Sequence, residues 1–173
     1  MTDRPETYYT LPADFAAALG QSIAAFGWLE EVMKRAIYAL DRARLAQDLN
    51  PDEMERWTKH MNDVADDSMG TVIDQLDAAM RRHPGVQHRL EVTDELQALK
   101  QFRNLFCHAS WNPTKTEGRW HPAFVHSKTG PFGDDFSAEE INAVSQRTHV
   151  LGERILKIMR RTGYEGKWPG DDG

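Results

Sequence analysis

Apolar residues recur at steps of three and four along the first third of the chain, which is the spacing of one face of an α-helix. Pro12 and Asp14 stand at the start of this pattern, which predicts a long amphipathic helix ending near residue 47. Gly20 and Gly27 each cost such a helix about 1 kcal/mol relative to alanine, so we expect another helix to pack closely against them. The apolar face consists of Phe15, Leu19, Ile23, Phe26, Leu29, Val32 or Met33, Ile37 and Leu40.

The same spacing predicts a second helical region over the next third of the chain. It begins at Asn50-Pro51, a pattern typical of an N-cap followed by proline, and it ends at His83-Pro84-Gly85. A group of acidic and small residues can divide this region into two helices: Asp66, Asp67, Ser68 and Gly70. The core candidates are Met54, Trp57, Met61, Val64, Val72, Ile73, Leu76 and Met80.

Two further helices are predicted on either side of a segment that breaks the helical pattern. Thr93 is the expected N-cap of the first of them. Ser137 and Glu140 form a capping-box pattern that opens the last helix, and Gly163 is expected to end it. The apolar face of the first of these helices consists of Leu96, Leu99, Phe102, Phe106 and Ala109, and that of the second includes Ile141, Val144, Thr148, Leu151 and Ile155.

In the intervening segment, residues 112–136, the residues that break a helix include Gly118, Pro122, Gly130, Pro131 and Gly133. Arg119-Trp120 and Ala123-Phe124-Val125-His126 are candidates for two short strands or for an extended excursion. The elements together predict a mainly α fold: an up-and-down bundle of four to five helices with this excursion before the last helix. The expected domain boundaries are an irregular arm over 1–12, one helical domain over 13–163 and a flexible tail over 164–173.

Composition and charge narrow the classes of function. A chain of 173 residues with 40% hydrophobic residues suits one domain with a substantial core. The net charge of -6 argues against a protein that coats nucleic acid through bulk positive charge, although a local basic cleft remains compatible with it. We find no charged-then-apolar leader and no apolar run of about 18 residues, so we expect a cytoplasmic protein that does not span a membrane.

The cysteine and histidines do not form the pattern of a metal or cofactor site. The single cysteine, Cys107, excludes a disulfide framework, and on an apolar helix it is more typical of a small buried side chain than of a nucleophile. His121 and His126 are five residues apart, which would place them on opposite faces of a strand. Neither Glu30 nor Glu31 belongs to the Glu-x-x-His pair of a di-metal bundle. We therefore expect no metal and no cofactor.

The segment from Arg103 to His108, with the sequence Arg-Asn-Leu-Phe-Cys-His, carries the most suggestive chemistry. At 100° per residue, Arg103 and His108 lie about 140° apart around a helix. Side chains that diverge in this way do not meet on a straight helix within one chain. Either the helix ends before His108, or the pair converges with a second copy of itself. The residues that share one polar helical stripe are Lys100, Asn104, His108 and Trp111.

An Arg-Asn-x-x-x-His element near the end of a late helix in a helical domain resembles the motif of the HEPN family. Arg103, Asn104 and His108 match the motif, and Ser110-Trp111 follows where relatives often carry small and aromatic residues. The resemblance implies a homodimer whose paired Arg and His side chains meet in one cleft between the subunits. It also implies a metal-independent endoribonuclease that cleaves RNA through attack by the 2′-hydroxyl. A phage-defence effector, or a toxin with an antitoxin protein as partner, is the biological setting it suggests.

The resemblance gives each residue near the motif an expected role. His108 would move the protons and Arg103 would stabilise charge on the phosphorus, with Asn104 orienting the imidazole or a phosphate oxygen. Lys100 would extend the positive charge along an RNA groove and Trp111 would stack on a base. Glu30 or Glu31 would hold Arg103 in place. The alternative is a catalytically silent HEPN-like module that binds a protein partner or a nucleotide.

Overall fold

Five helices and a two-stranded sheet make up the computed structural model, which describes residues 10–45, 50–66, 68–123 and 133–162. The predicted mainly α fold, with a small hairpin before the last helix, is confirmed. Most of the predicted arm, the whole tail and Gly163 lie outside the described residues. The elements in chain order are α1 (Ala13–Leu45), α2 (Pro51–Asp66), α3 (Met69–Arg82), α4 (Arg89–His108), β1 (Ser110–Pro113), β2 (Trp120–Ala123) and α5 (Ala138–Arg160).

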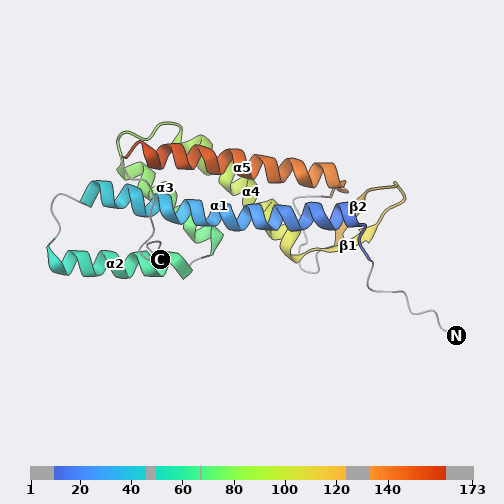
Figure 1. Ribbon diagram of the computed structural model, residues 1–173, viewed down its shortest axis with the longest axis horizontal. Helices are drawn as coiled ribbons and strands as arrows, with labels where there is room; N and C mark the ends of the chain where they lie inside the picture. The colour runs from blue at the N-terminus through green and yellow to red at the C-terminus, as the bar shows by residue number, and fades with distance from the viewer. Residues whose placement is uncertain (1–9, 46–49, 67, 124–132, 163–173) are drawn as a thin grey trace.

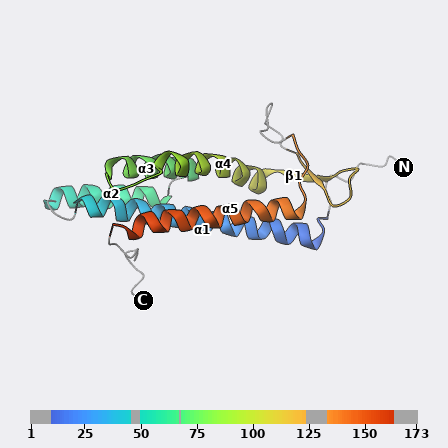
Figure 2. The same cartoon turned by 90° about the horizontal axis from the view of Figure 1, so that it is seen from above.

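Successive helices alternate in direction, whereas α1 and α5 lie side by side and run the same way (Figure 1). In the view from above in Figure 2, α3 and α4 form one row and α1 and α5 lie in a second row beside it. The end of α4 lies next to the hairpin. α2 and α3 lie along the half of the bundle that contains the C-terminal part of α1, on the left in Figure 1. The first half of α1 and the last turns of α4 therefore extend past both of these helices.

The closest approach between α1 and α5 is made by a glycine that the sequence pattern did not single out. A Cβ atom added to Gly152 would lie 2.2 Å from Cζ3 of Trp28, so only glycine lets the indole pack against the α5 backbone. The prediction that Gly20 and Gly27 contact another helix is wrong for the single chain. Both are exposed, with nothing within 4 Å of an added Cβ.

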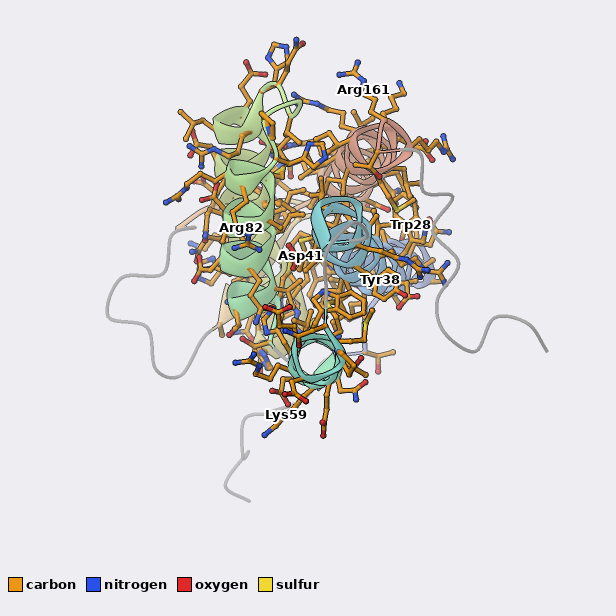
Figure 3. The ribbon with its side chains drawn as sticks, turned by 90° about the vertical axis from the view of Figure 1, so that its left-hand side faces the viewer. Trp28, Tyr38, Asp41, Lys59, Arg82 and Arg161 are labelled. Atoms are coloured by element: carbon orange, nitrogen blue, oxygen red, sulfur yellow. The ribbon has the colours of Figure 1, made fainter. Side chains whose placement is uncertain are left out.

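Contacts of α1 with α2 and α3 close the other half of the bundle. The rings of Tyr38 and Trp57 lie 5.0 Å apart where α2 meets α1. Arg82 at the end of α3 donates to the buried carboxylate of Asp41 in α1 at 2.8 Å, and both residues are labelled in Figure 3. An aromatic contact and a partly buried ion pair thus attach these two helices to the same end of α1.

Two of the predicted helix caps are confirmed and one is wrong. The Asn50 side-chain oxygen accepts from the Glu53 backbone N–H at 3.0 Å at the start of α2, and the predicted capping box opens α5. α4 begins four residues before the expected cap at Thr93. The Thr93 hydroxyl instead donates to Asp77 of α3 at 2.9 Å, so this side chain joins two helices rather than starting one.

The hairpin is confirmed, but its first strand lies earlier than the sequence pattern indicated. β1 follows α4 after a single residue and pairs antiparallel with β2, with Trp111 opposite Pro122. Trp111 and Trp120 both point into the core against Phe15, at ring distances of 5.1 and 5.7 Å. Packing of the two indoles explains the position of the strands, because two strands alone are marginally stable.

Candidate functional site

The motif lies entirely within α4, which continues through His108 and ends there. The Ala109 backbone N–H closes the last turn by donating to Leu105 at 2.9 Å. This excludes the alternative in which the helix ends before His108. Arg103 and His108 consequently remain about 140° apart on one continuous helix.

The polar side of α4 is open at this point because its neighbour α3 starts too late to cover it. The two helices run antiparallel, and Gly70 in the first turn of α3 lies against Lys100, with 3.7 Å between an added Cβ and the lysine Cδ. The eight residues from Gln101 to His108 therefore extend beyond the start of α3. Phe106 faces the core in this stretch, whereas Asn104 is half-buried and Cys107 is exposed. The expectation that Cys107 is buried is thus wrong.

Arg103 is held at the edge of α1 by one of its two candidate partners. Its Nε lies 3.4 Å from a carboxylate oxygen of Glu30, and its Nη1 donates to the Asn104 side-chain oxygen at 3.5 Å. Glu31 pairs with Arg35 at 2.8 Å instead. The Arg103 side chain is 31% exposed, and its remaining N–H groups have no partner among the described residues. The guanidinium is oriented but still able to contact an anion.

His108 ends α4 with its side chain exposed to solvent. It makes no hydrogen bond or ion pair with any residue that the structure describes. An accessible imidazole is able to accept a proton from a bound molecule or to donate one to it. Lys100, two turns earlier, lies over the first turn of α3 and is half-buried.

The position of Trp111 argues against its expected role in stacking on a base. Its side chain is 8% exposed, and its ring lies 6.1 Å from that of Phe106 and 5.9 Å from that of Phe136. The expectation extended the helical spacing of Lys100, Asn104 and His108 by one more turn. Because the helix ends at His108 and a strand follows, Trp111 turns into the core instead.

A second polar site lies beside the hairpin, and sequence reasoning missed it. Trp120 and Phe136 form a bridge with a 2.8 Å hydrogen bond in each direction, which places their neighbours His121 and Asp135 opposite each other. The His121 Nδ1 lies 2.8 Å from an Asp135 carboxylate oxygen. Arg119 donates to the Asp135 backbone carbonyl, which holds the loop of residues 133–136 against the hairpin.

The same loop borders a pocket of about 510 Å³ between the hairpin, α4 and α5. Its floor is apolar, and the Arg147 guanidinium lies 5.6 Å from the centre of the Phe102 ring while Glu95 binds it at 2.9 Å. Hydrogen bonding from the Ser137 backbone, together with Arg119, lowers the pKa of Glu140 below its ordinary value despite partial burial. The pocket is lined by Phe102, Arg119, Asp134, Asp135, Phe136, Glu140, Ala143, Val144 and Arg147.

No local signal in the sequence identifies this pocket. Asp135 and His121 are 14 residues apart, and only the pairing of Trp120 with Phe136 brings them together. The sequence pattern compared His121 only with His126, which lies outside the described residues.

Three observations bear on cofactors, membranes and relatives. Within the described ranges, no group of three or more His, Cys, Asp or Glu side chains is placed to hold a metal ion. None of the described helices has both the length and the apolar character needed to cross a membrane. Comparison with family models, with curated proteins and with solved structures found no match to this chain.

Proposed function

We propose that this protein is a homodimeric, metal-independent endoribonuclease of the HEPN type, with Arg103 and His108 as its catalytic residues. The observation that carries the proposal is the state of these two side chains at the open end of α4. Arg103 is oriented by Glu30, but some of its N–H groups have no partner among the described residues. His108 is exposed and also has no hydrogen-bond or ion-pair partner among them. A cation and a proton carrier are the two groups that metal-free RNA cleavage requires.

The chemistry follows from these two side chains. His108 accepts the proton of a ribose 2′-hydroxyl as its oxygen forms a bond to the adjacent phosphorus, and a water molecule protonates the 5′-oxygen as the P–O5′ bond breaks. Arg103 donates to the equatorial oxygens, where negative charge increases in the transition state. The products are a 2′,3′-cyclic phosphate and a free 5′-hydroxyl, with no change of redox state.

The proposed dimer follows from the divergence of Arg103 and His108 on one helix. A twofold axis near the end of α4 would bring Arg103 of each subunit toward His108 of the other. The adjacent face of α1 is suited to such packing, because Gly27 and Ile23 share a helical face with Glu30 and carry no charge. Ile23 is 45% exposed in the single chain. A second copy would also supply the close helix packing that Gly27 lacks within one subunit.

The direct test is cleavage of RNA in EDTA by the wild type and by Arg103→Ala and His108→Ala. Cleavage that persists in EDTA and is lost in both variants supports the proposal, with 2′,3′-cyclic phosphate ends as the expected product. Equal residual activity in all three proteins would identify a contaminating nuclease and reject it. Binding of a protein or nucleotide that is unchanged in His108→Ala, without RNA turnover, would instead favour a silent binding module.

A mixing experiment tests whether the site is shared between subunits. If each site combines Arg103 of one chain with His108 of the other, a heterodimer of the two inactive variants has one intact site. Random reassociation of the two variants should then restore about one quarter of wild-type activity. No recovery after verified subunit exchange would place both catalytic groups of a site in the same chain.

A further inference from the structure

The pocket beside the hairpin lies at the same end of α4 as the proposed catalytic residues. Phe102, which lines the pocket, precedes His108 by six residues, or about 9 Å along the helix axis. It stands on the side of α4 that faces α5, whereas Arg103 stands on the side that faces α1. An RNA strand that crosses the end of α4 would therefore pass from one site to the other.

One wall of the pocket carries an aromatic ring and a cationic group. The Arg147 guanidinium lies over the Phe102 ring and is also bound by Glu95. Aromatic rings and guanidinium groups both stack well on nucleobases, because every base presents a π-face. The volume of about 510 Å³ lies within the usual range for small-ligand pockets.

The three carboxylates at the rim of the pocket differ in the hydrogen bonds that they already accept within the protein. Glu140 accepts from Arg119 and from the Ser137 backbone, and Asp135 accepts from His121. Asp134 is exposed, lines the pocket and has no hydrogen-bond or ion-pair partner among the described residues. The group available to a ligand is thus the carboxylate of Asp134, whose two oxygens can accept hydrogen bonds.

We infer that this pocket binds a guanine base of the RNA substrate, stacked on the Arg147–Phe102 wall and hydrogen-bonded to Asp134. Guanine presents two adjacent N–H donors on its Watson–Crick edge, which match the two oxygens of one carboxylate. Adenine and cytosine present one amino group beside a ring acceptor, and uracil places its N–H between two acceptors, so neither pattern satisfies both oxygens. The inference rests on the proposed ribonuclease function, because it assigns a base preference to that reaction.

The first measurement is nucleoside binding, which requires no catalysis. Guanosine, adenosine and cytidine are titrated into the 173-residue protein by NMR or calorimetry. We expect guanosine to bind at least about tenfold more tightly than the other two, and Asp134→Asn to remove this advantage. Asp63→Asn is the matched control, because Asp63 is an exposed aspartate on α2, which contributes nothing to the pocket. Equal affinities, or equal effects of the two substitutions, would overturn the inference.

The second measurement is the position of the cuts in a mixed-sequence RNA. The wild type should cut at a fixed position relative to G, Asp134→Asn should lose this preference, and Asp63→Asn should keep it. Cuts that depend on Arg103 and His108 but show no base preference would reject the guanine pocket and leave the nuclease proposal standing. Guanosine binding that needs Asp134 in a protein that cleaves no RNA would reject the nuclease and retain the pocket as a guanine-binding site.

Discussion

The two halves of α4 carry charged side chains in different surroundings. In the first half, Asp77 of α3 accepts from Arg81 at 2.5 Å, from Thr93 at 2.9 Å and from Arg89. In the second half, beyond the start of α3, Arg103 has one contact of 3.4 Å with a carboxylate and a long contact with Asn104. The Asp77 carboxylate is fully committed to joining two helices, whereas the Arg103 guanidinium is oriented but largely available.

Exposure and the number of hydrogen-bond partners distinguish a structural ion pair from a candidate catalytic group, and neither can be read from the sequence. The Asp77 side chain is 13% exposed and already accepts three hydrogen bonds, so its removal should affect folding. Arg103 is 31% exposed and packs at the edge of the bundle, so its removal should affect binding more than folding. The following four predictions test that separation.

The largest expected effect is the loss of activity in His108→Ala. RNA cleavage should fall about a hundredfold or more, because proton transfer by a positioned side chain contributes on that scale. The thermal midpoint should stay unchanged, since His108 is exposed and makes no hydrogen bond or ion pair with the described residues. Cleavage rates and thermal melts on the same preparation measure both quantities. A large drop in the midpoint would show that His108 is structural, like Asp77.

The opposite outcome is expected for Asp77→Ala. The free energy of unfolding should fall by about 1–3 kcal/mol, because three donors lose their acceptor in a partly buried site. Cleavage by the folded fraction should be retained. Urea titration provides the measurement, and Asp74→Ala, an exposed aspartate on the same helix, is the control with an expected loss below about 0.5 kcal/mol.

Glu30→Gln should produce a smaller and selective effect. The substitution keeps the size of the side chain but removes the charge that orients Arg103, so cleavage should fall by up to about tenfold. Stability should change by less than about 1 kcal/mol, because the pair is partly exposed. Glu31→Gln is the control, since Glu31 pairs with Arg35 instead. Equal activities of the two variants would remove Glu30 from the site.

The smallest effect is the pH dependence of the Asp77 contribution. Burial raises the pKa of Asp77, but hydrogen bonds from Arg81, Thr93 and Arg89 outweigh it and hold this pKa below the ordinary value of 3.8. A lowered pKa in the folded state gives stability that is fully present above 3.8 and is lost as the pH falls below it. The stability advantage of the wild type over Asp77→Asn should therefore shrink in acid. Urea titrations of both proteins across that range measure it, and an advantage that grows in acid would contradict the assignment.

The helices were predictable because their signals are local. The apolar spacing in α1, the Asn50 cap and the Ser137–Glu140 capping box act within a few residues, and the structure contains all three. Errors arose where a side chain serves a distant partner. Thr93 binds Asp77 instead of capping α4, and Trp111 joins a cluster of aromatic rings instead of continuing the helical stripe.

The candidate site was predictable only in part for the same reason. The spacing of Arg103 and His108 implied their divergence, which the continuous α4 retains. The exposure of both side chains depends on where α3 begins, and the choice of Glu30 over Glu31 depends on how α1 packs on α4. The pocket beside the hairpin depends on the pairing of Trp120 with Phe136, which no pattern within either segment encodes.

The contact of Gly152 with Trp28 has a consequence for the axial alignment of the bundle. Sliding α5 along α1 by one helical turn would place Thr148 or Leu156 where only a hydrogen atom fits, so a single register is compatible with close packing. Through Ser137 and Phe136, α5 is joined to the bridge that holds the hairpin. Gly152, in the middle of the bundle, thereby helps to fix the position of the start of α5 relative to the hairpin.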